Sequence, residues 1–367
     1  MGKRELLIVT AFVVIGVVAY QLGAEPPAEG RRRFSLATLM DHFREETTGR
    51  RASATVTTEG AIPLPSTVTE ARISSVARVT VRGEARSDIG YSLSVEANGP
   101  DEGTARQNAA RTTLSQDEIG TVLALRANAP RDGRQVVSLT VRVPAKLRVR
   151  IEATQGGATL EASGLSDLQF DATGDVRLAG ISGSVTGIHR NGTVTIADSA
   201  GIELSLQNSE SAFDRTRGTK ITTRNGSCRI TGATGPLEIT TQNDEIILTR
   251  PAGPVRITGS GGSVVIEDPG DTVHVDTRRT SVDVKLARAV PLTILTTDEP
   301  LRLLLSEQPS FQLDAITTDG GTISAESLGV VPERINEEIR VRHTVNSGSV
   351  PVALRNRRGT IVISEAK

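Results

Sequence analysis

Histidine and carboxylate side chains are the residues of this sequence that could bind a metal ion. The chain holds four histidines among 367 residues. His274 and Asp276 are two positions apart, so both point to the same side of a strand, and Asp283 follows nearby. Imidazole and carboxylate groups are common ligands of divalent transition metals, so these three residues are weak candidates for a metal site. Solvated residues on the outer side of a strand show the same pattern. We favour that interpretation and expect no cofactor.

The single cysteine and a second histidine fall at positions where neighbouring repeats carry apolar side chains. One cysteine excludes an internal disulfide and a multi-cysteine metal site. Cys228 is predicted to be a small buried hydrophobe and not a nucleophile. His189 is predicted to be a packed, hydrogen-bonded core residue, with Gly187 leaving room for its ring. Neither residue therefore predicts catalysis.

Acidic residues at outward positions alternate with basic ones and do not gather on one face. Cleavage of a glycosidic bond needs two carboxyl groups that converge, and a calcium site needs several oxygen ligands together. The chain is therefore predicted not to be an enzyme; the alternative is a β-helix carbohydrate-active enzyme of polysaccharide lyase or hydrolase type. The outward series that mixes signs is Glu203, Lys220, Glu238, Arg256 and His274.

A repeat that runs from Leu147 to Ser310 positions these residues. A polar corner recurs every 17–19 residues, and apolar residues recur three and five places after it and four and six places before it. Asparagine and glycine suit a corner that needs positive φ. Threonine two places before the corner predicts a second ladder. The structural corners include Asn191, Asn208, Asn225, Asn243 and Gly261, and the threonines are Thr223, Thr241, Thr277 and Thr296.

Such a repeat predicts stacked copies of one unit. Alternation with a period of two puts one side of each strand into a core, but a unit of about 18 residues cannot bury that side alone. Stacking turns each apolar position into a ladder and pairs each strand with the next copy. The predicted fold class is all-β, a parallel β-solenoid (β-helix) of about ten rungs. An antiparallel sandwich also predicts alternation, but it does not predict a constant period.

The regions that flank the repeat have different patterns. Alternating segments between residues 71 and 146 predict antiparallel strands that cap the first rung of a solenoid at 147–367. Residues 101–111 are a short helix or a polar loop, and residues 52–69 read as linker. After Ser310 the repeat continues, with an insertion at 326–345 that is a lateral binding loop or a simple cap. The four alternating segments are 77–82, 91–96, 121–126 and 136–143.

The N-terminal residues predict a membrane anchor. Leu6–Leu22 is an uncharged apolar run that would span roughly 25 Å as a helix, and Lys3 and Arg4 precede it. We favour an uncleaved anchor at residues 1–24 over a cleaved signal peptide. The C-terminal bulk would then lie in the periplasm or cell exterior, although Arg31–Arg33 oppose that orientation. Residues 25–70 would be a stalk whose amphipathic helix, 34–43, docks on the first domain or lies on the membrane surface.

Composition excludes one class of partner. The chain has 42 Lys and Arg against 43 Asp and Glu, a net charge of −1. It therefore lacks the basic excess that binds phosphate backbones. With no tryptophan and 2% aromatic residues, it also lacks platforms on which bases stack. We predict no nucleic-acid partner.

Three features together resemble the bacterial putative-adhesin family of uncharacterised domains. They are the segment Val141-Arg-Val-Pro-Ala-Lys-Leu-Arg-Val-Arg150, the repeated Asn-Gly corners, and the closing segment 352–364. The resemblance covers residues 71–367 and is structural, so it transfers no catalytic residue. The sequence departs from the pattern where a corner lacks glycine, at Ser209-Glu210, Arg279-Thr280 and Asp298-Glu299, and wider or bulged corners are expected there.

The resemblance implies an exported bacterial envelope protein with a β-solenoid and no established enzyme activity. The expected function is a membrane-anchored, extracytoplasmic, non-catalytic adhesin-like module that serves for interaction or as a scaffold. An envelope protein or a polysaccharide is the expected partner besides the cytoplasmic membrane. The sequence does not predict the oligomeric state.

Overall fold

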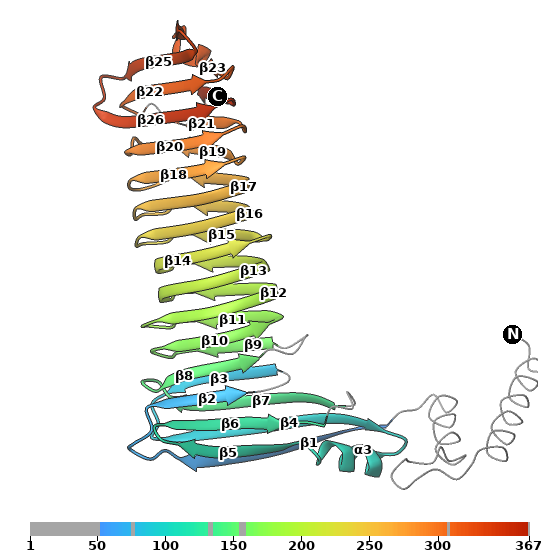
Figure 1. Cartoon of the computed structure of the whole chain (residues 1–367). Helices are drawn as coiled ribbons and strands as arrows, with labels where there is room; N and C mark the ends of the chain where they lie inside the picture. The colour runs from blue at the N-terminus through green and yellow to red at the C-terminus, as the bar shows by residue number, and fades with distance from the viewer. Residues whose placement is uncertain (1–51, 75–77, 131–134, 154–158, 307–308, 366–367) are drawn as a thin grey trace, which may run out of the picture. The chain divides into compact units, whose positions relative to one another are not determined.

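Strands make up most of the described chain. The computed structural model describes residues 52–74, 78–130, 135–153, 159–306 and 309–365, and Ala52–Lys367 is one compact unit. Within the described ranges, one α-helix, α3 (Glu102–Ala109), and one short 3-10 helix, η1 (Glu326–Leu328), accompany the strands (Figure 1). The predicted all-β class is confirmed.

No helix in the described ranges is long and apolar enough to cross a membrane. The predicted anchor at residues 6–22 and the predicted amphipathic helix at residues 34–43 both lie outside the described residues. Both therefore stay predictions.

The central part of the chain is a stack of parallel strands, in which the two strands of each repeat form one rung (Figure 1). Each strand pairs in parallel with the strand one repeat further along, so that Val255 lies opposite Val273. First strands of the repeat stack on first strands, and second strands on second strands. The stack contains β8 (Arg148–Ala153), β9 (Thr159–Ser163), β10 (Leu168–Thr173), β11 (Asp175–Ala179), β12 (Val185–Ala197), β13 (Ala200–Asp214), β14 (Arg217–Arg224), β15 (Ser227–Thr231), β16 (Leu237–Thr249), β17 (Val255–Glu267), β18 (Val273–Arg278), β19 (Ser281–Leu286), β20 (Leu292–Thr297) and β21 (Leu301–Leu305).

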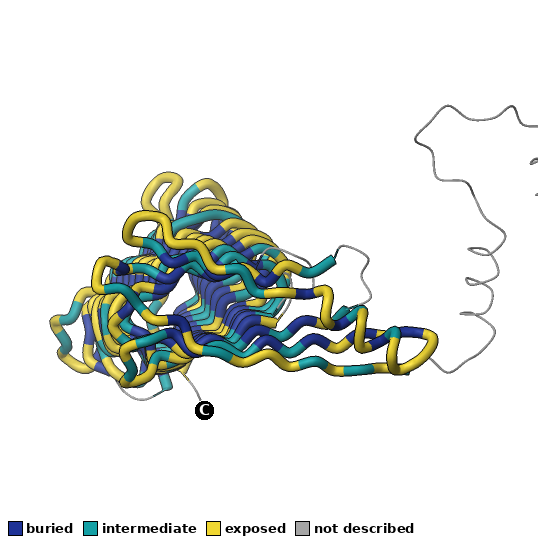
Figure 2. The backbone as a smooth tube through the Cα atoms, turned by 90° about the horizontal axis from the view of Figure 1, so that it is seen from below, coloured by how far each residue is buried: buried dark blue, intermediate teal, exposed yellow. Residues whose placement is uncertain are grey.

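Apolar side chains from both strands of each repeat fill the interior of the stack. Figure 2 shows the buried residues along the inside of the backbone tube. The predicted inner positions that the structure describes are buried, with the exception of Gly187. Each buried Val, Leu or Ile stabilises the fold by about 1.5–3 kcal/mol relative to an exposed one. A Cβ at Gly187 would lie 2.5 Å from the ring of Phe170. The prediction that Gly187 leaves room for His189 is therefore wrong, because the phenylalanine occupies that space.

The predicted corner residues adopt the left-handed backbone conformation. Their φ angles are 62° for Asn191, 50° for Asn208, 55° for Asn225, 58° for Asn243 and 74° for Gly261. Two corners without glycine adopt the same left-handed conformation, with φ of 51° at Arg279 and 70° at Asp298. The predicted threonine ladder is found in part: Thr223 lies opposite Thr241, but Gly259 stands between Thr241 and Thr277. All four threonines are buried.

A second left-handed corner follows the second strand of each repeat, and the sequence did not predict it. Its residues donate their backbone N–H to a carbonyl of the next rung, as in Arg250 N to Glu267 O at 2.8 Å. Four of its six residues given below are charged. The φ angles are 63° for Gly180, 50° for Asp198, 49° for Arg215, 61° for Gly232, 51° for Arg250 and 48° for Asp268.

The N-terminal end of the unit mixes parallel and antiparallel pairing. β2 pairs in parallel with β8 and β6, and β3 with β9 and β7. β4 then covers β7, β1 covers β4, and β5 covers β6, all antiparallel. The strands are β1 (Ala52–Pro63), β2 (Glu70–Ser74), β3 (Arg78–Glu84), β4 (Asp88–Gly99), β5 (Thr113–Ile119), β6 (Val122–Asn128) and β7 (Gln135–Pro144).

Two predictions about this end are wrong. Strands β2 and β3 are parallel, not antiparallel, because parallel pairing adds Ile73 and Val81 to the inner columns, where both are 0% exposed. Residues 52–69 are not all linker, because residues 52–63 form β1 along β4. β1 lies at the edge of the sheet, and its alanines alternate with threonines along the strand. An edge strand buries little apolar surface, so these small side chains suffice there. Residues 101–111 include a helix, capped by Asp101 Oδ1 accepting from Thr104 N at 2.8 Å.

At the C-terminal end the spatial order of the strands differs from their chain order. β26 lies between β20 and β22, and β27 lies between β21 and β23. The sequence predicts these two rungs, but the period does not encode which one lies outermost. β25 pairs antiparallel with β22 and β24 with β25, which favours the cap for the insertion at 326–345. The strands are β22 (Phe311–Thr318), β23 (Thr322–Ser324), β24 (Glu333–Ile335), β25 (Glu338–Val345), β26 (Val350–Arg357) and β27 (Thr360–Glu365).

Candidate ligand groove

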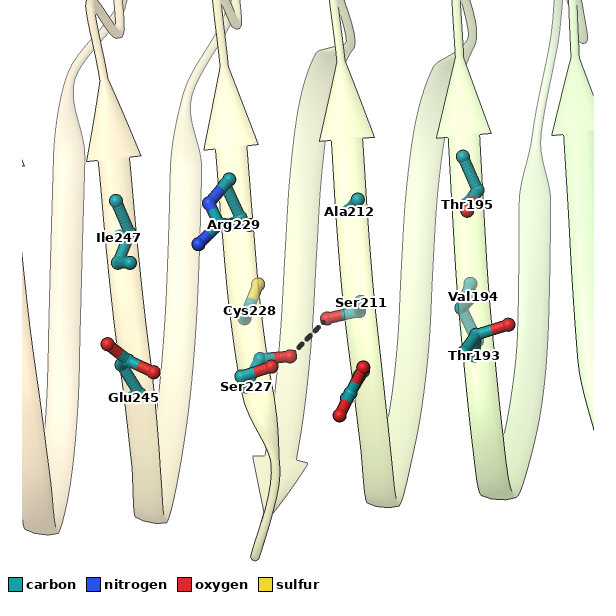
Figure 3. Close-up of a pocket in the computed structure, with 11 residues that line it drawn as sticks. Thr193, Val194, Thr195, Ser211, Ala212, Ser227, Cys228, Arg229, Glu245 and Ile247 are labelled. Carbon is teal, nitrogen blue, oxygen red and sulfur yellow. Dashed lines mark hydrogen bonds between the residues drawn. The ribbon is translucent and has the colours of Figure 1, made fainter.

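A shallow hollow lies over four neighbouring second strands, beside the asparagine corners. Two adjoining cavities of about 190 Å³ and 590 Å³ form it and share Thr193, Glu210, Ser227 and Glu245. Figure 3 shows the residues that line the first cavity, among them Glu245 and Arg229 on neighbouring strands. We call this hollow the polar groove. Its polar residues are Thr193, Thr195, Asn208, Ser209, Glu210, Ser211, Asn225, Ser227, Arg229 and Glu245.

Strand register aligns the four shared residues in one column. Thr193 lies opposite Glu210, Glu210 opposite Ser227, and Ser227 opposite Glu245. With rungs about 4.8 Å apart, the Cα atoms of the two glutamates are roughly 10 Å apart. The groove therefore presents two carboxylates on either side of a hydroxyl.

The two groove carboxylates are exposed and form no ion pair with a described residue. Elsewhere on the stack, adjacent rungs pair opposite charges, as Lys220 Nζ and Glu203 Oε1 do at 3.8 Å. Other exposed acids, such as Glu238, also form no ion pair with a described residue, but the groove places two such carboxylates in one column.

The asparagine ladder beside the groove is interrupted within it. Asn208 Nδ2 donates to Asn191 Oδ1 at 3.0 Å, and Asn243 Nδ2 donates to Asn225 Oδ1 at 3.4 Å. Among the described residues, Asn208 and Asn225 form no side-chain bond with each other, although they occupy adjacent rungs. An amide donor and an amide acceptor therefore remain available to a ligand at the groove.

The residues beneath the groove are structural. Cys228 is 1% exposed, and burial raises the pKa of its thiol to about 12, with the nearby Asp244 charge adding to the rise. The Ser211 hydroxyl beside it donates to Ser227 O at 2.9 Å (Figure 3). A thiol that stays protonated is not a nucleophile, so the prediction for Cys228 agrees with its position.

His189 is a buried core residue with two hydrogen bonds, as predicted. Its side chain is 0% exposed, with Nε2 2.6 Å from Gly174 O and Nδ1 2.7 Å from Ser209 Oγ. Because Gly174 O can only accept, Nε2 carries a proton. Burial lowers the pKa of the imidazole, against the smaller effects of the Gly174 bond and of Asp175.

The structure does not bring the weak metal candidates together. His274 and Asp276 lie on first strand β18, whereas Asp283 lies on second strand β19, across the corner. Asp283 Oδ1 instead pairs with Arg302 Nη1 at 3.2 Å. In the described part of the chain, no group of three or more His, Cys, Asp or Glu side chains could hold a metal ion.

Asp244 is a buried carboxylate that sequence reasoning missed. It is 2% exposed and accepts hydrogen bonds from the Thr223 and Thr241 hydroxyls at 3.1 and 2.8 Å. It also accepts from Gly226 N and Gln242 N at 2.7 and 2.9 Å. The available signal was that an acid stands where two neighbouring corners have glycine, at the position that follows the corner residue.

Comparisons with known proteins find remote structural similarity. No family model matches the chain, and no curated protein matches it. A solved structure of a putative cell adhesion protein from Clostridium sporogenes is 9% identical and covers 86% of this chain and 100% of its own, with a TM-score of 0.18. A putative adhesin from Parabacteroides merdae is 9% identical, covers 68% of this chain and 94% of its own, and has a TM-score of 0.31.

A third solved structure has a different description. A putative lipid binding protein from Parabacteroides distasonis is 12% identical and covers 66% of this chain and 94% of its own, with a TM-score of 0.32. At these identities and TM-scores, the similarities do not assign a function to this chain.

Proposed function

We propose that this chain is a β-solenoid of the bacterial cell envelope that acts as a non-catalytic, adhesin-like interaction module. Its polar groove binds a hydroxyl-rich envelope polysaccharide. The observation that carries the proposal is the column Thr193, Glu210, Ser227 and Glu245, whose carboxylates have no cationic partner among the described residues. Carboxylate and amide groups hydrogen-bond to sugar hydroxyls, and bonds to charged groups contribute about 1.5–3 kcal/mol each.

Parallel pairing at a nearly constant offset supports the β-solenoid. Both strands of the repeat pair with the next copy, from β8 and β9 to β20 and β21. An antiparallel sandwich of hairpins would pair successive strands in opposite directions. The repeat therefore favours one coiled stack whose outer side is available to a partner.

The membrane anchor belongs to the same proposal. The uncharged run at residues 6–22 would hold the module at the cytoplasmic membrane, with its C-terminal bulk in the periplasm or cell exterior. Lys3 and Arg4 favour that orientation, and Arg31–Arg33 oppose it. Protease added to intact spheroplasts should degrade residues 52–367. Protection of these residues would place the module in the cytoplasm.

The groove favours binding over catalysis. In an inverting glycosidase, one carboxyl group must donate a proton and the other must activate water, about 6.5–9.5 Å apart. The carboxyl group that donates the proton normally lies in an apolar pocket that excludes water. Glu210 and Glu245 are both exposed. The carbohydrate-active enzyme nevertheless remains the alternative function, since the two acids share one column.

Binding of neutral polysaccharides to variants of the groove tests the proposal. The full-length protein would be screened against neutral glucans and galactans, and its affinity compared with that of the E210Q/E245Q double variant. We expect the double variant to lose about tenfold or more in affinity, as removal of charged hydrogen bonds predicts. Glu238→Gln is the matched control, because Glu238 is also exposed and lies on β16, outside the groove.

Two outcomes would contradict the proposal. Equal affinity of the double variant and the unchanged protein would remove the groove as the binding site. Release of shorter saccharides by the unchanged protein, lost in both single variants, would establish the enzyme instead.

A further inference from the structure

The second left-handed corner carries charged residues in one ladder column. Asp198 and Arg215 occupy adjacent rungs of this column, and so do Arg250 and Asp268. All four have φ between 48° and 51°. Gly232 separates the two pairs. The column therefore contains the same acid–base pair twice, in the same backbone conformation.

The first pair is closed. Arg215 Nε lies 2.7 Å from Asp198 Oδ1, and Arg215 Nη2 lies 2.9 Å from Asp198 Oδ2. This two-point contact lowers the pKa of Asp198, chiefly through the side-chain hydrogen bond. The guanidinium of Arg215 is occupied by protein carboxylates and is not available to a ligand.

The second pair is open. Neither Arg250 nor Asp268 forms an ion pair within the described residues, and both line a cavity of about 370 Å³. Arg288 lines the same cavity and also forms no ion pair with a described carboxylate. Its guanidinium lies over Gly270, where a Cβ would come within 2.5 Å of Nη2. Two guanidinium groups that form no ion pair with a described carboxylate thus border one hollow.

The floor of this hollow is apolar. It is formed by Pro251, Ala252 and Ala287, of which Pro251 is buried. A saccharide ring packs its C–H face on such a floor and directs its hydroxyl and carboxylate groups to the rim. The volume is close to the lower end of small-molecule sites, about 300–1,000 Å³, which suits one sugar unit.

We propose that Arg250, Arg288 and Asp268 form a second binding site, for a carboxylated saccharide such as a uronic acid unit of an envelope glycan. The inference rests on the proposed function for the ligand class, a glycan. Guanidinium groups bind carboxylates in a planar, two-point geometry. Asp268 accepts a hydrogen bond from a ring hydroxyl and leaves a net charge of +1, which matches a monoanion better than a phosphate dianion.

The test uses the full-length protein and a galacturonic acid trimer, measured by isothermal titration calorimetry. The methyl ester of the same trimer has the same shape without the charge. We expect the ester to bind at least about tenfold more weakly, and Arg250→Gln and Arg288→Gln each to weaken binding of the acid by a similar factor. Arg215→Gln, which opens the closed pair elsewhere in the column, should leave the affinity unchanged.

Several results would overturn this inference. They are no binding of the acid, equal binding of the ester, an equal loss in Arg215→Gln, or displacement of the acid by an equal concentration of inorganic phosphate. The E210Q/E245Q variant separates the two proposals. If it binds the acid normally but not the neutral glycan, both proposals stand. Normal binding of neutral glycans with no binding of the acid overturns this inference alone.

Discussion

Burial determines the protonation of His189, a titratable residue in the interior of the stack. His189 has two polar neighbours, Gly174 O and Ser209 Oγ, but no carboxylate in contact with its ring. Burial lowers the pKa of the ring below its ordinary value of about 6.5. The unfolded chain therefore takes up a proton more readily than the folded one. The resulting stability is present above about pH 6.5 and is lost as the pH falls toward the folded pKa.

The residue-scale prediction follows from this sign. The free energy of unfolding of the unchanged protein should decrease between pH 7 and pH 5 by more than that of His189→Gln, measured by urea denaturation at each pH. His274→Gln is the control and should keep the pH dependence of the unchanged protein, because this histidine lies on the outer side of β18. An identical pH dependence for His189→Gln would contradict the assignment.

Side-chain burial could be predicted from the sequence to a large extent, but the groove could not. The period of two places Cys228 and His189 inside without knowledge of their partners. The burial of Asp244, by contrast, depends on four donors supplied by two rungs. Glu210 and Glu245 are 35 positions apart in the chain, and the strand register that brings them into one column was not read from the sequence.

At the scale of the element, the corner after Asn243 depends on its buried carboxylate. Replacement of Asp244 by alanine leaves the buried Thr223 and Thr241 hydroxyls without this acceptor. The part-buried Gly226 and Gln242 N–H groups lose it as well. An unpaired buried polar group costs about 1–3 kcal/mol. We expect Asp244→Ala to lower the free energy of unfolding by about 2–4 kcal/mol, measured by chemical denaturation.

A matched replacement on the same strand provides the comparison. Glu238→Ala removes an exposed acid from β16 and should change the free energy of unfolding by no more than about 0.5 kcal/mol. If Asp244→Ala and Glu238→Ala proved equally mild, the four hydrogen bonds of Asp244 would not stabilise the corner. The left-handed corner itself was predictable from asparagine and glycine. The second corner was not predicted, although glycine and aspartate at four of its six positions favour such turns; arginine at the other two has no such preference.

At the scale of the whole described unit, both ends interleave strands from distant parts of the chain. β2 and β3 lie between β8–β9 and β6–β7, and β26 and β27 lie between β20–β21 and β22–β23. In a simple repeat protein, loss of the terminal unit costs one interface. Here the terminal segment lies beneath another rung, so its loss should release that rung as well.

A chain that ends at residue 348 tests this consequence. It lacks β26 and β27, and amide hydrogen exchange should show loss of protection in β22 and β25 although both are still present. A chain that ends at residue 365 is the control and should keep their protection. Protection of β22 in the shorter chain would show that it does not need β26. The sequence predicts both rungs, but not their order, because each fits the same inner columns.

Interleaved ends also restrict how such a chain can change its length in evolution. A tandem duplication that adds one unit between β10 and β19 inserts one more rung. Both of its neighbours pair with it in parallel, in the same way as they pair with each other. The same duplication at residues 350–365 would place two copies in competition for the single slot under β22 and β23. Related chains of different length should therefore differ in the number of central units and keep both ends constant.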